Sequence, residues 1–76
     1  MKLKEIKHQH DYEFLLTFAN GETASVDLET LISPHVKPQE INTAQINQEW
    51  GCLEFKGGTV DVEPKTLYQF TKNQIH

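Results

Sequence analysis

Three acidic residues near the C-terminal end are spaced so that their carboxylates could lie together. Glu54 falls in one predicted strand, Asp61 falls in the next, and Glu63 lies two residues further along the chain. In the expected hairpin Glu54 lies opposite Asp61 on the face away from the core, which suits a hard cation or a basic partner surface. Because Ca²⁺ normally takes about six to eight oxygen ligands, we favour a solvated face, with Lys56 nearby to relieve repulsion between like charges.

Two histidines form a second candidate site. His8 and His10 are two residues apart at the end of a predicted strand, so both side chains could face the same way. With Asp11 they could bind zinc, although a stable zinc site normally has about four ligands. His35 and His76 are too distant in sequence to complete such a site. We therefore predict exposed histidines in a turn and no metal site.

Cys52 is the single cysteine, so no internal disulfide can form. A nucleophilic thiol needs an adjacent base and a group that stabilises an oxyanion, and no histidine lies near Cys52 in the sequence. Gly57 and Gly58 join two predicted strands instead of opening a helix, so they are not a phosphate-binding loop. We predict no catalytic residue, no cofactor and no enzymatic activity.

Trp50 and Tyr68 are the residues that we assign to an interaction surface. Large aromatic side chains with a polar group are favoured in protein interfaces. Trp50 lies in a predicted connection, where it could be exposed or could fold over the edge of a thin core. Unpaired strand edges are the other expected route of contact, and Lys2, Lys4 and Lys7 would guard the edge of the first strand.

Length and charge limit the classes of protein that fit. With 76 residues the chain has room for one core, so we predict a single domain over 1–76, ordered over about 1–72 and frayed over 73–76. The net charge of −4 argues against direct nucleic-acid binding, which depends on neutralising phosphates. No apolar run reaches the roughly 20 residues that span a membrane. The N-terminus has no hydrophobic signal region, and we expect a cytoplasmic protein.

The first half of the chain predicts a three-stranded unit. We expect strands over 1–7 and 12–18, with a polar turn between them. A three-residue loop that includes Asn20 and Gly21 would place Gly21 in the left-handed region, where glycine carries no steric penalty. This register collects the apolar side chains on one face. It pairs Phe18 with Glu22, Leu16 with Ala24, Phe14 with Val26 and Tyr12 with Leu28.

The middle of the chain is less regular. Asp27 is the expected N-cap of one or two helical turns that end at Ser33-Pro34. An extended surface loop should follow over 34–38. Residues 43–48 fit a strand or a short helix capped by Asn42, and we favour the strand. Residues 49–51 then form a tight connection into Cys52.

The last part predicts a hairpin and a helix. A two-residue turn at Gly57-Gly58 pairs Phe55 with Val60 and Leu53 with Val62. Pro64 fits the first position of a helix capped by Glu63, because the missing N–H costs nothing there. Leu67, Phe70 and Thr71 would share its inner face, with Tyr68 at the margin, and the helix should end near Asn73. The predicted class is therefore α+β: a small, mostly antiparallel sheet built from hairpins, one short middle helix and a C-terminal helix.

The order of these patterns resembles a small bacterial family, domain of unknown function 2442. The resemblance covers most of the chain from Met1 to about Phe70. It rests on Phe18, Asn20 and Gly21, on Asp27 and Leu28, on residues 51–55, and on Asp61, Pro64, Leu67 and Tyr68. Two departures are a shorter middle segment around 34–38, and Phe55-Lys56-Gly57-Gly58 where relatives often carry Trp-Pro-Asn-Gly.

The resemblance implies an α+β fold and little chemistry. Some relatives are encoded beside another small protein, which implies a regulatory or toxin–antitoxin-like partnership. We therefore expect a non-catalytic interaction or regulatory module that binds a small protein partner or forms a homodimer. The alternative is a domain that binds a small ligand or a metal through Glu54, Asp61 and Glu63, or through His8 and His10.

Overall fold

Two small antiparallel sheets and a few short helices form the structure. The computed structural model describes residues 1–73. The tail that was predicted to be frayed is 73–76, and residues 74–76 of it lie outside the described residues. The first sheet has the order β1-β2-β3 and the second has the order β4-β5-β6. The elements are β1 (Leu3–His10), β2 (Glu13–Phe18), β3 (Thr23–Asp27), α1 (Glu29–Ile32), the 3₁₀ helix η1 (Pro38–Thr43), β4 (Gln45–Ile46), β5 (Leu53–Phe55), the 3₁₀ turn η2 (Lys56–Gly58), β6 (Val60–Val62) and α2 (Pro64–Asn73).

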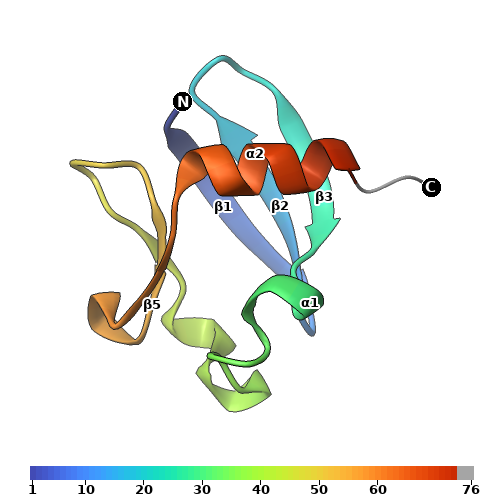
Figure 1. Ribbon diagram of the computed structural model, residues 1–76, viewed down its shortest axis with the longest axis vertical. Coiled ribbons are helices and arrows are strands. Elements are labelled where there is room, and N and C mark those ends of the chain that lie inside the picture. The colour runs from blue at the N-terminus through green and yellow to red at the C-terminus, as the bar shows by residue number, and fades with distance from the viewer. Residues whose placement is uncertain (74–76) are drawn as a thin grey trace.

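The predicted α+β class is confirmed, and the hairpins are divided between the two sheets. Helix α2 crosses one face of the β1-β2-β3 sheet, and the second sheet lies beside its first turn (Figure 1). The Leu3 N–H donates to the Gly51 carbonyl at 3.1 Å, so the start of β1 is joined to the connection between β4 and β5. This bond links the two sheets where their edges approach.

The first hairpin has the predicted register. Phe14 pairs with Val26 and Leu16 with Ala24, and the Phe18 N–H donates to the Glu22 carbonyl at 2.8 Å. Gly21 has a φ of 90°, in the left-handed region that the loop requires. The alternating apolar residues of this hairpin are therefore buried on one face, under α2.

Strand β1 extends further than predicted. It runs to His10, so His8 and His10 belong to a strand and not to a turn. The reversal falls at Asp11, whose φ of 47° is left-handed. The pairing with β2 shifts between His8 and His10, which is a β-bulge. The bulge adds a residue to β1 and so breaks the alternation of its side chains.

The middle segment differs most from the prediction. The first residue of α1 is Glu29, and its N–H donates to Asp27 Oδ1 at 2.9 Å, although the N-cap position itself is Leu28. The expected surface loop over 34–38 contains Val36, which is fully buried. The Tyr12 hydroxyl donates to the Val36 carbonyl at 2.6 Å and holds this segment against the first sheet.

A 3₁₀ helix, η1, follows where no helix was predicted. It starts at Pro38, and the Lys37 N–H donates to the Glu40 carboxylate at 2.9 Å, closing its first turn. Ile41 is buried beneath it. The strand favoured over 43–48 is present, but β4 covers only Gln45–Ile46. The 3₁₀ helix takes Thr43, and a turn begins after Asn47, so little length remains for the strand.

Two tight connections follow β4 and β5. Around Trp50, the Gly51 N–H donates to the Asn47 carbonyl at 2.7 Å. The last hairpin has the predicted register, Leu53 with Val62 and Phe55 with Val60. Both turn glycines have positive φ, as a primed turn requires. Lys56 also adopts a left-handed φ of 57°, so the strands stop at Phe55 and resume at Val60, with η2 between them.

Helix α2 spans the predicted residues. It starts at Pro64 and ends at Asn73. Leu67 is fully buried and Phe70 is half-buried, as the inner-face pattern predicts. The Leu67 N–H donates to the Glu63 carbonyl at 3.0 Å in the first turn; a cap by the Glu63 side chain stays a prediction.

One hydrophobic cluster receives side chains from both sheets and from the helices. Within residues 1–73 no polar or charged residue other than Tyr12 is buried. Burial of apolar surface is the main stabilising term of such a small protein. The buried members are Leu3, Tyr12, Phe14, Leu16, Phe18, Val26, Leu28, Ile32, Val36, Ile41, Leu53, Phe55 and Leu67.

We predict that Gly51→Ala destabilises the protein far more than Gly21→Ala. Both glycines have positive φ, so each alanine adds about 1 kcal/mol of backbone strain. At Gly51 a Cβ would also lie 2.8 Å from the Lys2 Cα, whereas at Gly21 it meets open space. Overpacking adds about 1–3 kcal/mol more. Urea unfolding measures both variants, and equal losses would contradict the close approach of Lys2 to Gly51.

Candidate functional site

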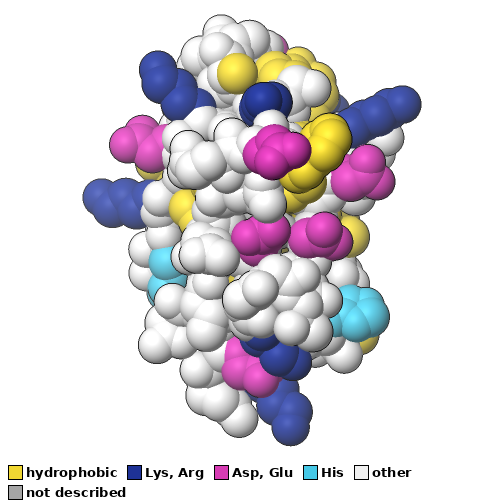
Figure 2. Space-filling view, turned by 90° about the vertical axis from the view of Figure 1, so that its left-hand side faces the viewer, with side chains coloured by type: hydrophobic (Ala, Val, Ile, Leu, Met, Phe, Trp, Pro, Cys, Tyr) yellow, Lys and Arg dark blue, Asp and Glu magenta, His cyan; other side chains and the backbone are white. Residues whose placement is uncertain are grey.

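The three predicted acidic residues lie together on the outer face of the β4-β5-β6 sheet. Glu54 pairs with Asp61 across β5 and β6, and Glu63 follows β6 directly. Their neighbours Leu53 and Phe55 are fully buried on the opposite face. The side of the molecule that carries this sheet shows acidic side chains in its middle (Figure 2).

Amide groups, and not a lysine, contact Glu54. Gln45 Nε2 donates to Glu54 Oε1 at 3.2 Å, and Asn47 Nδ2 donates to Glu54 Oε2 at 3.0 Å. The expectation that Lys56 relieves the repulsion between these carboxylates is wrong. Lys56 Nζ lies 3.5 Å from Glu40 Oε2 instead, because the left-handed turn at Lys56 directs the chain toward η1. The acidic face therefore keeps its negative charge.

Cys52 lies on this same face, at the start of β5, and is half-buried. Burial raises the pKa of the Cys52 thiol, and the carboxylates of Asp61, Glu63 and Glu54 raise it further. The thiolate is the nucleophilic form of cysteine. The surroundings therefore favour the protonated thiol over the thiolate.

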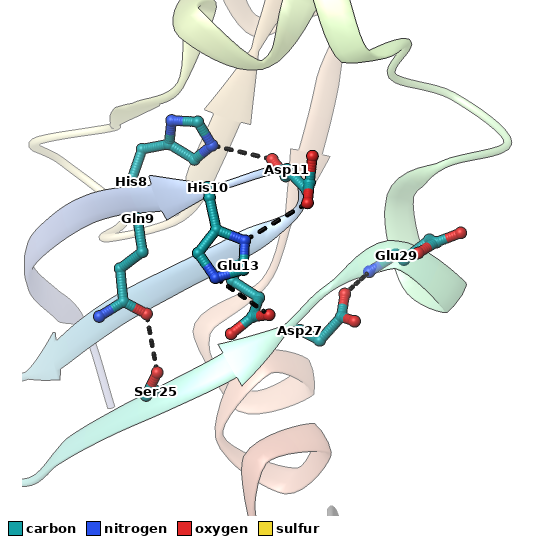
Figure 3. Close-up of polar contacts among 8 residues, drawn as sticks. All are labelled: His8, Gln9, His10, Asp11, Glu13, Ser25, Asp27 and Glu29. Atoms are coloured by element: carbon teal, nitrogen blue, oxygen red, sulfur yellow. Dashed lines mark hydrogen bonds and ion pairs between the residues drawn. The ribbon is translucent and has the colours of Figure 1, made fainter.

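The two histidines diverge because of the bulge. His8 pairs with Phe14, and its ring lies 5.1 Å from the Phe14 ring. His10 pairs with Glu13, and its ring nitrogens lie 3.3 Å from Asp11 Oδ2 and 3.4 Å from Glu13 Oε2 (Figure 3). The His8 Nε2–H donates to the Asp11 carbonyl at 2.8 Å. In the part of the chain that the structure describes, no three His, Cys, Asp or Glu side chains are grouped to hold a metal ion.

Trp50 is exposed at the end of the β4–β5 connection. Its relative exposure is 65%, the largest among the exposed large hydrophobic residues. Asn47 Oδ1 accepts the backbone N–H groups of Glu49 and Trp50, each at 2.9 Å, and so fixes the turn. Gly51, the next residue in the chain, helps to line a groove of 340 Å³ together with Leu3 and Ile46, although Trp50 itself is not a lining residue.

Tyr68 is not among the residues that line this groove, and its side chain makes contacts within the chain. Its ring packs edge-on against Phe18 at 5.2 Å, and its hydroxyl donates to Glu22 Oε1 at 2.8 Å. Lys72 Nζ lies 2.8 Å from Glu22 Oε2 and 4.9 Å from the Tyr68 ring centroid. These contacts tie α2 to the turn between β2 and β3. Glu22 was not among the candidates, because its partners lie 46 and 50 residues away in the sequence.

The cluster around Glu22 shifts two pKa values. Hydrogen bonds from Lys72, Tyr68 and Asn20 hold the pKa of the Glu22 carboxyl below its ordinary value. The hydrogen bond and charge of Glu22 raise the pKa of Lys72. Both groups are solvent-exposed, so the cluster fixes the position of the helix more than it stabilises the fold.

We predict that the Glu22 cluster makes stability fall in acid. A carboxyl whose pKa is lowered on folding stabilises the folded state above its unfolded pKa, and this stabilisation is lost as the pH falls through the folded value. Wild type should therefore lose more stability than Glu22→Gln as the pH falls below the ordinary value of 4.5. Urea unfolding across this range measures the difference, and parallel curves would refute the prediction.

We predict that the Cys52 thiol reacts slowly with a disulfide reagent at mildly alkaline pH. Its raised pKa lowers the thiolate fraction, so the native protein should react more slowly than the urea-unfolded chain. Asp61→Asn should speed the native reaction, and Glu5→Gln, an exposed charge change on the other sheet, should not. A native rate equal to the unfolded rate would show that the thiol is not shielded.

The comparisons with known proteins give a family and no function. Within residues 1–73 no helix is long and apolar enough to cross a membrane. Neither the curated proteins nor the solved structures contain a match. The family model described as "Protein of unknown function (DUF2442)" matches residues 3–73, which is nearly the whole chain. The chain therefore belongs to the DUF2442 family.

Proposed function

We propose that this chain is a non-catalytic module that binds a protein partner through Trp50 and the groove beside it. The exposure of Trp50 supports the proposal most directly. Tryptophan is enriched among the residues that dominate binding energy in protein interfaces. An exposed indole in a small protein leaves apolar surface in water that a partner would bury.

The groove supplies the surface around Trp50 that a partner needs. Leu3 and Ile46 give it an apolar part, and Lys2 and Lys4 add positive charge. The turn that carries Trp50 is held by four hydrogen bonds within residues 47–52: two to the Asn47 side chain, one from Gly51 to the Asn47 carbonyl and one from Asn47 to Cys52. Binding would therefore order few additional groups, which lowers its entropic cost.

The partner we propose is a small cytoplasmic protein or a second copy of this chain, in a regulatory role. The single cysteine fits a reducing compartment. The Glu54 carboxylate already accepts hydrogen bonds from two side-chain amides. The raised pKa of Cys52 lowers the fraction of the nucleophilic thiolate. These observations favour binding over catalysis as the role of the surface.

We predict that Trp50→Ala removes partner binding without unfolding the protein. Tagged wild type and variant are compared by quantitative co-purification from native lysate, and purified samples by analytical ultracentrifugation. Wild type should retain one stoichiometric protein or self-associate, and the variant should lose at least about nine-tenths of that binding, as expected of a hot-spot residue. Gln69→Ala, an exposed change on α2, is the matched control.

Two outcomes would reject the proposal. One is a strictly monomeric wild type whose partners are unchanged in Trp50→Ala. The other is a thermal-shift screen in which a divalent metal or a common metabolite raises the melting temperature, because a ligand that binds the folded state stabilises it. That result would support the ligand-binding alternative.

A further inference from the structure

The outer edge of β6 has an unsatisfied backbone. Within residues 1–73, β6 pairs with β5 and with no other strand. The Asn47 N–H donates to the Cys52 carbonyl, so the backbone groups of Cys52 face β4. In an antiparallel sheet the direction of the backbone groups alternates along a strand. The N–H and carbonyl of Glu54 therefore also face β4, while those of Leu53 and Phe55 face β6. The Asp61 N–H and carbonyl therefore face away from the sheet, where another strand could pair with them.

A groove with an apolar part and an acidic part runs beside this edge. It has a volume of 280 Å³ and lies between β6 and α1, where its apolar lining residues are Leu31, Ile32, Val60 and Val62. Three of these, Leu31, Val60 and Val62, are only half-buried. A hollow of 220 Å³ lined by His35 and Thr59 adjoins Val60 and continues along the strand. A free backbone edge beside an apolar groove is the arrangement that binds an extended peptide by strand addition.

The negative charge around β6 determines which kind of segment can pair with this edge. Asp61 and Glu63 line the groove, Glu54 lies opposite Asp61, and these carboxylates together raise the pKa of Cys52. A second copy paired antiparallel about the centre of β6 would place Asp61 opposite Asp61, and like charges directly opposite destabilise a pair of strands. A segment with a cation opposite Asp61 would gain the attraction instead.

We propose that the β6 edge binds an extended segment of another protein in which basic and apolar residues alternate. The residue opposite Asp61 shares its face of the sheet, so a lysine or arginine there meets the carboxylates. The neighbouring residues point to the other face and lie over the groove beside Val60 and Val62. This edge is distinct from the Trp50 surface, and the inference does not depend on the proposed function.

The test uses the full chain, labelled with ¹⁵N, and the peptide acetyl-Lys-Val-Lys-Val-Lys-Val-Lys-amide. Titration at low salt should shift the backbone amide signals of residues 59–63 and slow the hydrogen exchange of the Asp61 N–H. Asp61→Asn should weaken binding about five-fold, the effect of an exposed ion pair of about 1 kcal/mol. Glu5→Gln makes the same charge change on the other sheet and should leave the affinity unchanged.

Two peptides separate strand addition from charge attraction alone. The Glu-Val analogue should not bind, because it places carboxylates opposite Asp61. An analogue with N-methylated lysines keeps the charge, but the lysine opposite Asp61 can no longer donate to the Asp61 carbonyl. Its methyl group also blocks the close approach of a paired strand, so it should leave the exchange of the Asp61 N–H unchanged. Equal binding of the N-methylated and unmodified Lys-Val peptides, equal affinities of Asp61→Asn and Glu5→Gln, or no amide shift over 59–63 would each overturn the inference. Trp50→Ala should bind the Lys-Val peptide like wild type, so the two proposals fail independently.

Discussion

The arrangement of this small protein depends on the close approach of Lys2 to Gly51. A three-stranded sheet of this size buries only one face, so the two sheets have to share a core. They meet where the Leu3 N–H reaches the Gly51 carbonyl, and a side chain at Gly51 would occupy the space that Lys2 fills. Leu3 is thereby buried in the common cluster. The same contact adjoins the turn that carries Trp50, so the position of the proposed interaction surface follows from the contact between the sheets.

A fold built from two short sheets leaves strand edges that a small core cannot cover. The β1 edge is partly closed by β4 and carries lysines, which natural proteins use to discourage unwanted strand pairing. At the other end, β6 presents Asp61 at its centre, and this carboxylate disfavours pairing with a second copy. A charge that disfavours pairing of β6 with the β6 of a second copy can also select a partner segment of opposite charge. Asp61 would thus both disfavour pairing of β6 with a second copy and favour a partner segment with a basic residue.

Sequence periodicity predicted the hairpins because strand register is a local property. The alternation over Tyr12–Phe18 and the left-handed position of Gly21 define the first hairpin, and the pattern around Gly57-Gly58 defines the second. The middle segment was missed because its contacts are distant: the bond from Tyr12 to Val36 spans 24 residues. The bulge that separates His8 from His10 is an irregularity of pairing that no residue spacing signals. The position of Tyr68 likewise depends on Glu22, 46 residues earlier.

The chemical groups that suggested reactivity are held in ways that suppress it, and this bears on the kind of function. Catalysis requires groups whose pKa values and positions suit proton transfer or nucleophilic attack. Glu54 is occupied by two amides, and the pKa of Cys52 is shifted away from the reactive form. Within residues 1–73 the fold leaves apolar surface exposed at Trp50 and a strand edge unpaired at β6. Another polypeptide could cover the first and pair with the second, and this is the physical basis of both proposals.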